Sequence, residues 1–118
     1  MTHNFRKLKI WSEGISLVRD SYKMTRTFPE YEKYGLANQM NRCAVSIPSN
    51  IAEGSSKGTD RHFGKFLETS LGSAFEWETQ LVVAFNEGYI KEEKFKNLKD
   101  RIQQLQKMIS RFRGGLGH

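Results

Sequence analysis

The chain of 118 residues contains one cysteine, two prolines, three histidines and no long apolar run. A single cysteine cannot form an internal disulfide, which indicates a reducing compartment and a cytoplasmic location. No stretch reaches the ~20 apolar residues that a membrane-spanning helix requires. The N-terminus also lacks the apolar run of a signal peptide. We therefore expect a cytoplasmic protein with no membrane partner.

The few histidines and the single cysteine also limit the possible chemistry. A di-iron site in a helical bundle needs a histidine three residues after a glutamate, and no glutamate in this chain has one. A zinc site needs a cluster of cysteine and histidine ligands. Cys43 lies on an apolar helix stripe with no identifiable base, so it is interpreted as a core residue rather than a nucleophile. We expect no metal, no cofactor and no enzymatic activity.

Apolar residues recur at helical spacing through most of the chain. This periodicity predicts four helices, at about 7–26, 36–54, 59–87 and 91–112. The connections contain glycine or proline, and residues 113–118 are expected to be a disordered tail. The pattern predicts one all-α domain over residues 1–118, an up-down-up-down antiparallel four-helix bundle.

The first predicted helix has more apolar surface than one seam of a bundle needs. One stripe is Leu8, Trp11, Ile15, Val18 and Tyr22, with helical spacing typical of a core face. A second column repeats every seven residues, at Ile10, Leu17 and Met24, with Gly14 and Ser21 beside it. We expect the first stripe to face the core. The second column then either meets another subunit or widens contact with the domain's own core.

The most unusual stretch is Arg42–Gly54, RCAVSIPSNIAEG, which has a proline inside a predicted helix. An interior proline costs ~3 kcal/mol or more unless polar groups or packing compensate. Apolar spacing continues past Pro48, so the second helix is predicted to be kinked rather than ended there. The polar side chains around it are expected to bond the disturbed backbone, and Arg42 to pair with Glu76 or Glu53. The residues assigned to this structural motif are Arg42, Ser46, Pro48, Ser49, Asn50, Glu53, Gly54 and Glu76.

Charge is unevenly distributed along the chain, whose net charge is +6. Residues 1–26 hold six basic and two acidic side chains, residues 27–90 hold five and eight, and residues 91–118 hold eight and three. The two basic ends suggest a basic face formed by the first and last helices, which either attracts nucleic acid or an acidic protein or is only a solvated surface. Candidate nucleic-acid contacts are Arg6, Lys7, Lys9, Lys99, Arg101, Lys107, Arg111 and Arg113.

A second candidate site is the loop GSSKGT at residues 54–59. It lacks the GxxxxGK[ST] spacing and the preceding strand of a phosphate-binding loop. Amides at the start of the third helix, with basic side chains around them, could still hold a phosphate or sulfate. The residues of this candidate anion site are Lys57, Arg61 and Lys65.

Four segments of the chain resemble a known family. They read FRKLKIW, FPEYEKYGLANQMNRCAVSIPSNIAEG, FGKFLETSLGSAFEWETQL and NEGYI. Together they resemble the four-helix-bundle proteins encoded in intervening sequences of bacterial 23S ribosomal RNA genes. The resemblance spans Phe5 to Phe112 and departs mildly at Cys43, where the family often has alanine, and at Trp77, where it more often has leucine.

The resemblance implies an all-α bundle that assembles as a ring-shaped homopentamer. It also implies similarity to the accessory protein of diversity-generating retroelements, a basic pentamer that binds nucleic acid and a reverse transcriptase. The family brings no catalytic residues to this chain. We expect a non-enzymatic oligomeric scaffold whose basic surface binds RNA, DNA or a ribonucleoprotein. The alternative is a protein-interaction module with an acidic partner and no nucleic-acid role.

Overall fold

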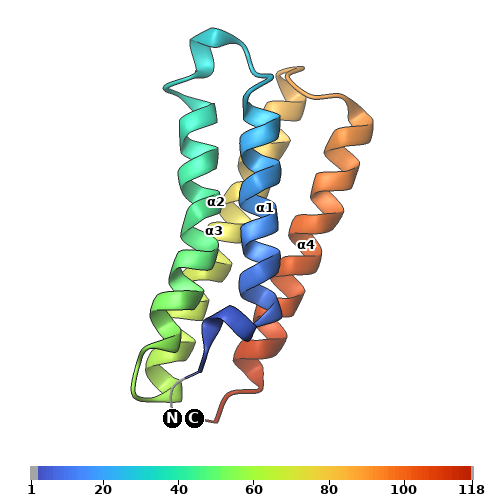
Figure 1. Ribbon diagram of the computed structural model, residues 1–118. Coiled ribbons are helices and arrows are strands. Elements are labelled where there is room, and N and C mark those ends of the chain that lie inside the picture. Colours follow the sequence, from blue (N-terminus) through green and yellow to red (C-terminus); the bar gives the residue numbers. More distant parts are fainter. Residues whose placement is uncertain (1–2, 118) are drawn as a thin grey trace.

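The structure, a computed structural model, describes residues 3–117 and consists of helices and their connections. The α-helices in this range are α1 (Lys9–Thr25), α2 (Leu36–Ser55), α3 (Asp60–Asn86) and α4 (Glu92–Gly114). Short 3-10 turns precede α1 and α2, η1 (Phe5–Lys7) and η2 (Glu30–Glu32). Figure 1 shows an antiparallel bundle, 46 × 24 × 20 Å, with both termini at one end. The predicted fold class is confirmed, and each helix end lies within two residues of its predicted position.

Three of the predicted helix faces form the core as expected. The stripe of α3 from Phe63 through Trp77 to Ala84 is buried at all seven of its positions. The buried positions of α2 and α4 also follow their predicted stripes, and Trp77 is the largest fully buried side chain. None of the helices within residues 3–117 is long and apolar enough to cross a bilayer.

Helix α1 is oriented differently from the prediction. Ile10, Leu17 and Met24 are buried, whereas Ile15 and Tyr22 of the stripe assigned to the core are 45% and 42% exposed. The prediction of which column faces the core was therefore wrong. The reason is that Gly14 and Ser21, between the columns, are both buried against other helices. Hydrophobicity gives no sign of such contacts, because glycine and serine add little to an apolar pattern.

Helix α2 continues without a break through Pro48, which is buried. A Cβ placed on Gly14 of α1 would lie 3.3 Å from the Pro48 Cβ, so the proline ring packs directly on this glycine. A second close approach involves Gly54, where a Cβ would lie 2.6 Å from the Phe66 Cβ of α3. The middle and the C-terminal end of the unusual segment thus bring α2 close to neighbouring helices.

A buried polar network joins three helices in the half of the bundle away from the termini. The indole Nε1 of Trp77 donates to Ser21 Oγ at 3.0 Å, and this hydroxyl donates to Asn41 Oδ1 at 2.9 Å. The Asn41 amide donates to Thr25 Oγ1 at 3.0 Å. Because an unsatisfied polar group in a core is costly, this network favours one register of α1, α2 and α3.

The connection before α2 is held by Glu32. Its carboxylate accepts from the Leu36 amide at 3.1 Å and from the Tyr89 hydroxyl at 2.8 Å. These two donors lower the pKa of Glu32, the Leu36 amide being the stronger cause. The hydrogen bond with the Tyr31 hydroxyl, followed by the bond to Glu32, raises the pKa of Tyr89. Glu32 therefore caps the start of α2 and ties it to the turn before α4.

The C-terminal residues also differ from the sequence prediction. Helix α4 extends to Gly114, Leu116 packs against the core, and the Gly117 amide donates to Asp60 Oδ2 at 3.1 Å. Residues 113–117 are thus placed by contacts with α3 rather than forming a disordered tail. His118, the last residue of the predicted tail, lies outside the described residues.

Candidate nucleic-acid interface

Three distant parts of the chain meet at the end of the bundle that carries the termini. The His3 ring lies 5.1 Å from the Phe63 ring of α3 and 5.9 Å from the Phe112 ring of α4, measured between centroids. The bond from Gly117 to Asp60 adds a contact between the tail and α3. The antiparallel topology therefore brings the start of α1, the connection from α2 to α3, and the last turns of α4 together (Figure 1).

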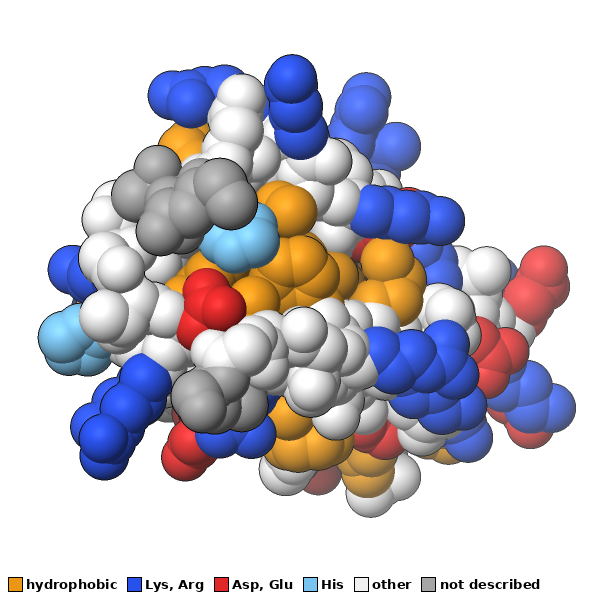
Figure 2. All heavy atoms as spheres, turned by 90° about the horizontal axis from the view of Figure 1, so that it is seen from below, with side chains coloured by type: hydrophobic (Ala, Val, Ile, Leu, Met, Phe, Trp, Pro, Cys, Tyr) orange, Lys and Arg blue, Asp and Glu red, His pale blue; other side chains and the backbone are white. Residues whose placement is uncertain are grey.

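Basic side chains gather at this end. Figure 2, which views the molecule from the end with the termini, shows lysine and arginine side chains around much of its rim and apolar side chains near its centre. We call the following basic side chains at this end the basic end: Arg6, Lys7, Lys9, Lys57, Arg61, Lys65, Lys107 and Arg111. Within residues 3–117 none of them forms an ion pair, and all but the half-buried Lys57 are exposed.

Two of the predicted nucleic-acid contacts are instead used within the bundle. Arg101 of α4 forms an ion pair with Asp20 of α1 and donates to Ser16 Oγ at 2.8 Å. Arg113 donates from Nε to the Gly64 carbonyl at 3.0 Å and pairs with Glu68 at 2.8 Å. A guanidinium held by two partners is less available to a phosphate. These two arginines therefore act first as links between helices.

Lys99, another predicted contact, is also separate from the basic end. It lies in the first half of α4, and its Nζ is 5.5 Å from the centroid of the Phe95 ring. Of the eight predicted contacts, five remain exposed at the basic end: Arg6, Lys7, Lys9, Lys107 and Arg111.

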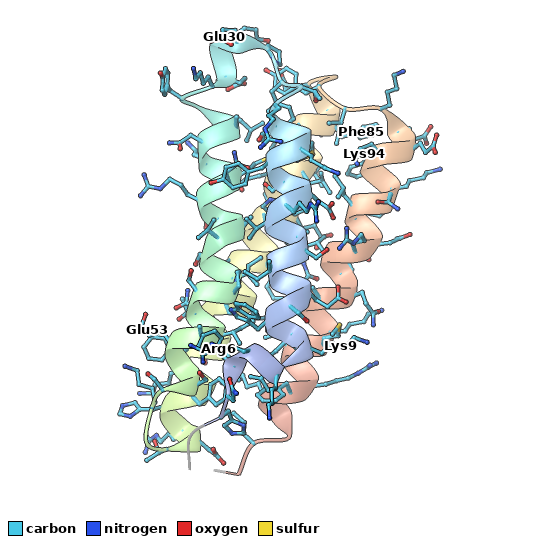
Figure 3. The ribbon with its side chains drawn as sticks, in the orientation of Figure 1. Arg6, Lys9, Glu30, Glu53, Phe85 and Lys94 are labelled. Carbon is cyan, nitrogen blue, oxygen red and sulfur yellow. The ribbon has the colours of Figure 1, made fainter. Side chains whose placement is uncertain are left out.

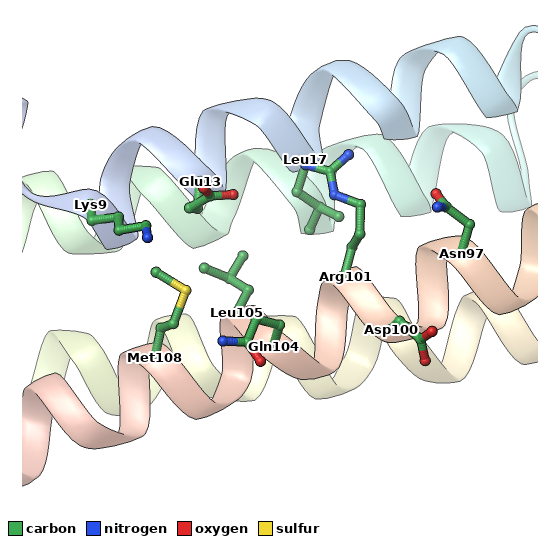
Figure 4. A pocket seen from close by; sticks show the side chains of 9 residues that line it. All are labelled: Lys9, Glu13, Leu17, Asn97, Asp100, Arg101, Gln104, Leu105 and Met108. Atoms are coloured by element: carbon green, nitrogen blue, oxygen red, sulfur yellow. The ribbon is translucent and has the colours of Figure 1, made fainter.

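A cleft of about 410 Å³ separates α1 from α4 above the basic end. In Figure 4, Lys9 and Glu13 project from α1, and Arg101 reaches across from α4. Asp100 adds a second carboxylate to the lining. A wall with both signs of charge does not attract a polyanion as the basic end does.

The three residues of the candidate anion site lie at the basic end. Arg61 and Lys65 are exposed on the first turns of α3, whereas the Lys57 Nζ lies 4.9 Å from the Phe66 ring centroid. Thr59 caps the helix by accepting from the His62 amide at 3.2 Å. Asp60, in the first turn, already places a carboxylate at the helix start. These residues contribute charge to the basic end rather than forming a separate cradle.

The sequence was next compared with known proteins. The family model described as 23S rRNA-intervening sequence protein matches residues 6–111. The chain belongs to this family. A crystal structure with a similar fold is that of a protein of unknown function from the S23 ribosomal protein family of Bacteroides thetaiotaomicron. It is 18% identical, with a TM-score of 0.81 over 87% of this chain and 96% of that one. A search of curated proteins gives no match.

In this 23S rRNA-intervening sequence family protein, the SIPSNIAEG segment forms structural contacts. Asn50 Nδ2 donates to the Ser46 carbonyl at 2.8 Å and to Ser46 Oγ at 3.0 Å. The Ser46 hydroxyl reaches Ser73 Oγ of α3 at 2.8 Å, and Ser70 Oγ donates to the Ile47 carbonyl at 2.8 Å. Asn50 thus bonds a backbone carbonyl as expected, whereas the Ser46 hydroxyl bonds the Asn50 and Ser73 side chains and Ser49 is exposed.

The expected ion pair of Arg42 is not formed. The three ion pairs within residues 3–117 leave out Arg42, Glu53 and Glu76. Arg42 and Glu76 line the same groove between α2 and α3, while Glu53 is exposed farther along α2. Both guanidinium and carboxylate remain in contact with water, which removes the electrostatic need for a direct pair.

Cys43 lies at the floor of this groove and is only 7% exposed. Its thiol donates to the Ser73 carbonyl at 3.0 Å. Burial, with a contribution from the nearby Glu76 carboxylate, raises the pKa of Cys43 to about 12. The thiol therefore stays protonated near neutral pH, unlike a catalytic cysteine. In the part of the chain that the structure describes, no group of three His, Cys, Asp or Glu side chains could hold a metal ion.

Two apolar surfaces are exposed; sequence reasoning expected surplus apolar surface on α1 but assigned it to the wrong column, and it missed the surface on α3. On α1, Ile15 and Tyr22 lie toward α2; on α2, Val45 is one turn from Asn41 and Pro48, which both face α1. We call the residues Trp11, Ile15, Val18, Tyr22 and Val45 the α1–α2 surface.

The second surface lies on α3. Phe75 is 52% exposed and Val82 37%, and they flank Glu78 at helical spacing. Glu78 accepts from Gln103 at 2.9 Å and Gln106 at 2.8 Å, so this side of α3 is directed toward α4. We call Leu71, Phe75 and Val82 the α3–α4 surface. The signal that could have found the α3–α4 surface was the same excess of apolar residues over one bundle seam that the first helix shows.

Proposed function

We propose that this protein is a non-enzymatic, oligomeric helical scaffold that binds RNA or a ribonucleoprotein through its basic end. The observation that carries this proposal is the convergence of basic side chains from three parts of the chain, with no ion pair among residues 3–117 to neutralise them. Membership of the 23S rRNA-intervening sequence family, whose name refers to the location of the genes, specifies no partner, so the proposal rests on the basic end.

The chemistry of the basic end favours contacts with phosphate rather than with bases. Lysine and arginine side chains on a convex, solvated surface attract the phosphate backbone without reading its sequence. The aromatic rings at this end are largely engaged: Phe63 and Phe112 pack on His3, and Lys57 covers Phe66. Few rings remain to stack on unpaired bases, so we expect low sequence specificity.

The oligomeric part of the proposal rests on the two apolar surfaces. The α1–α2 surface and the α3–α4 surface lie on opposite sides of the bundle, because the four helices are arranged in chain order around the core (Figure 1). Two different surfaces suit a head-to-tail contact, which closes into a ring when the rotation from one subunit to the next divides a full turn, and otherwise continues as a filament. The family resemblance sets the expected ring at five subunits.

A filter-binding titration tests the nucleic-acid part. Wild type is compared with a variant carrying Arg61→Ala, Lys65→Ala, Lys107→Ala and Arg111→Ala, using a single-stranded RNA at low salt. The matched control removes four exposed basic groups elsewhere, through Arg19→Ala, Arg26→Ala, Lys33→Ala and Arg42→Ala. We expect the first variant to lose most RNA retention and the control to keep it. Equal losses, or no retention by wild type, would reject the basic end and favour an acidic protein partner.

A further inference from the structure

A second concave site lies at the end of the bundle opposite the basic end. It is a pocket of about 430 Å³ between the last turn of α1, the turn before α4 and the first turn of α4. This volume is within the range of about 300–1,000 Å³ that ligand-binding clefts occupy. Figure 3 places Lys94 at this end of the molecule, far from Arg6 and Lys9.

The pocket combines an apolar floor with a basic rim. Met24, Tyr89 and Ile90 supply the apolar lining, and three exposed lysines surround it: Lys23, Lys91 and Lys94. No carboxylate lines the pocket, and none of these lysines forms an ion pair among the described residues. Glu92, the acidic side chain next to Lys91, pairs instead with Lys96 at 3.3 Å. Glu93 lines a neighbouring pocket with Lys91 and Lys94 rather than this one, so the rim carries a net positive charge.

The apolar floor of the pocket is held in place by the fold. Met24 is 2% exposed and belongs to the core. Tyr89 packs on the Phe28 ring with centroids 5.3 Å apart and donates to Glu32. The turn before α4 is fixed by the Tyr89 amide, which donates to the Ala84 carbonyl at 2.9 Å. A fixed floor reduces the ordering cost of binding a small ligand.

We propose that this pocket binds a phosphorylated nucleoside. The flat aromatic face of a base can pack on the lining of Met24, Tyr89 and Ile90, and a phosphate fits a rim with three ammonium groups. A phosphate carries up to two negative charges and three acceptor oxygens, which use such a rim better than the single charge of a carboxylate. The ligand is either a free nucleotide or the phosphorylated end of an RNA strand, and the two share this chemistry.

Calorimetric titration with AMP tests the site, using adenosine and inorganic phosphate as separate probes. We expect AMP to bind more tightly than either part alone, since each part fills half of the pocket. Lys91→Ala with Lys94→Ala should weaken AMP binding at least roughly tenfold. Lys99→Ala with Lys107→Ala, on the same helix but outside the pocket, should leave it unchanged. The four-alanine basic-end variant should also bind AMP normally, which separates this site from the proposed function.

The source of the ligand is decided by a second arm with the basic-end variant, whose own RNA binding is removed. A short RNA with a 5′-phosphate is compared with the same RNA ending in a 5′-hydroxyl. Preference for the 5′-phosphate, abolished by Lys91→Ala with Lys94→Ala, assigns the pocket to an RNA end. Binding of AMP alone assigns it to a free nucleotide. No binding of AMP up to about 10 mM and no 5′-phosphate preference would overturn the proposal, as would binding that survives the double substitution.

Discussion

The ring of Pro48 in α2 packs directly on Gly14 of α1, where a Cβ would lie 3.3 Å from the Pro48 Cβ and 3.4 Å from its Cδ. This contact explains how a proline is accommodated in the middle of a helix. The proline ring occupies the space beside Gly14, which has no side chain. Bonds from Asn50 and Ser70 hold the Ser46 and Ile47 carbonyls, which directly precede the proline.

A larger side chain at position 14 should separate α1 from α2. Gly14→Leu forces the proline ring away and should lower the unfolding free energy by about 1–3 kcal/mol through overpacking. Gly14→Ala requires a shift of only a few tenths of an ångström and gains about 1 kcal/mol of helix propensity, so we expect little change. Urea unfolding followed by circular dichroism measures both. Equal stability of the leucine variant and wild type would show that the contact is not tight.

Pro48→Ala should have two opposing effects on the unfolding free energy. Alanine restores an amide donor and removes a helix cost of ~3 kcal/mol. It also removes two methylenes from the contact with Gly14, worth about 0.8 kcal/mol each. The subunit should therefore become slightly more stable, or change its assembly state, before RNA affinity changes. Loss of RNA binding by an intact oligomer of this variant would contradict the structural role of the segment.

The buried network predicts strong coupling between Ser21 and Trp77. Ser21→Ala leaves the buried indole N–H without an acceptor and Asn41 without one donor, which should cost about 1–3 kcal/mol. In Trp77→Phe the indole donor is absent, so the same serine substitution should cost less. A double-mutant cycle from urea unfolding measures the difference. Additive effects of the two substitutions would show that the network does not link α1 to α3.

Glu32 predicts a pH dependence of stability with a definite sign. Its pKa is lowered in the folded protein from an ordinary value of 4.5, so its stabilising effect is present above that value. The effect is lost as the pH falls through the folded-state pKa. The difference in unfolding free energy between wild type and Glu32→Gln should be largest near neutral pH and shrink under acidic conditions. A difference that is constant with pH would mean that the carboxylate charge does not matter at this cap.

The head-to-tail assembly predicts a distinctive result when two blocked variants are mixed. Ile15→Glu blocks the α1–α2 surface and Phe75→Glu blocks the α3–α4 surface, so each variant alone should be monomeric. An equimolar mixture retains one intact pair of surfaces and should form a heterodimer, measured by light scattering after size exclusion. Gln104→Glu, outside both surfaces, should assemble as wild type does. A two-fold interface that paired one surface with itself would instead leave one of the two variants dimeric on its own, and mixing would produce no new species.

The helices could be predicted because their apolar stripes follow from local spacing alone. The side of α1 that faces the core could not be predicted, since its two apolar columns recur with the same seven-residue period. The choice between them is made by Gly14 against Pro48 and Ser21 against Trp77, which are contacts between distant segments. The position of Leu116 and Gly117 was missed for the same reason, because their partners lie on other helices.

The candidate site shows the same division. Composition indicates two basic chain ends, and the antiparallel topology places them together with the start of α3. Composition does not show which basic side chains already form ion pairs. Arg101 and Arg113 look the same in sequence as Arg111, yet only the first two bond neighbouring helices. Ion pairing depends on side-chain positions that helical spacing alone leaves open.

The central claim, that the basic end holds nucleic-acid phosphates, is tested most directly by the salt dependence of RNA binding. The affinity of wild type for a single-stranded RNA, plotted as log K against log salt concentration, should fall with a slope of about −0.7 for each phosphate contacted. Lys107→Ala with Arg111→Ala should make the slope shallower by up to about 1.4. A slope near zero for wild type, or the same slope in the double variant, would contradict the account.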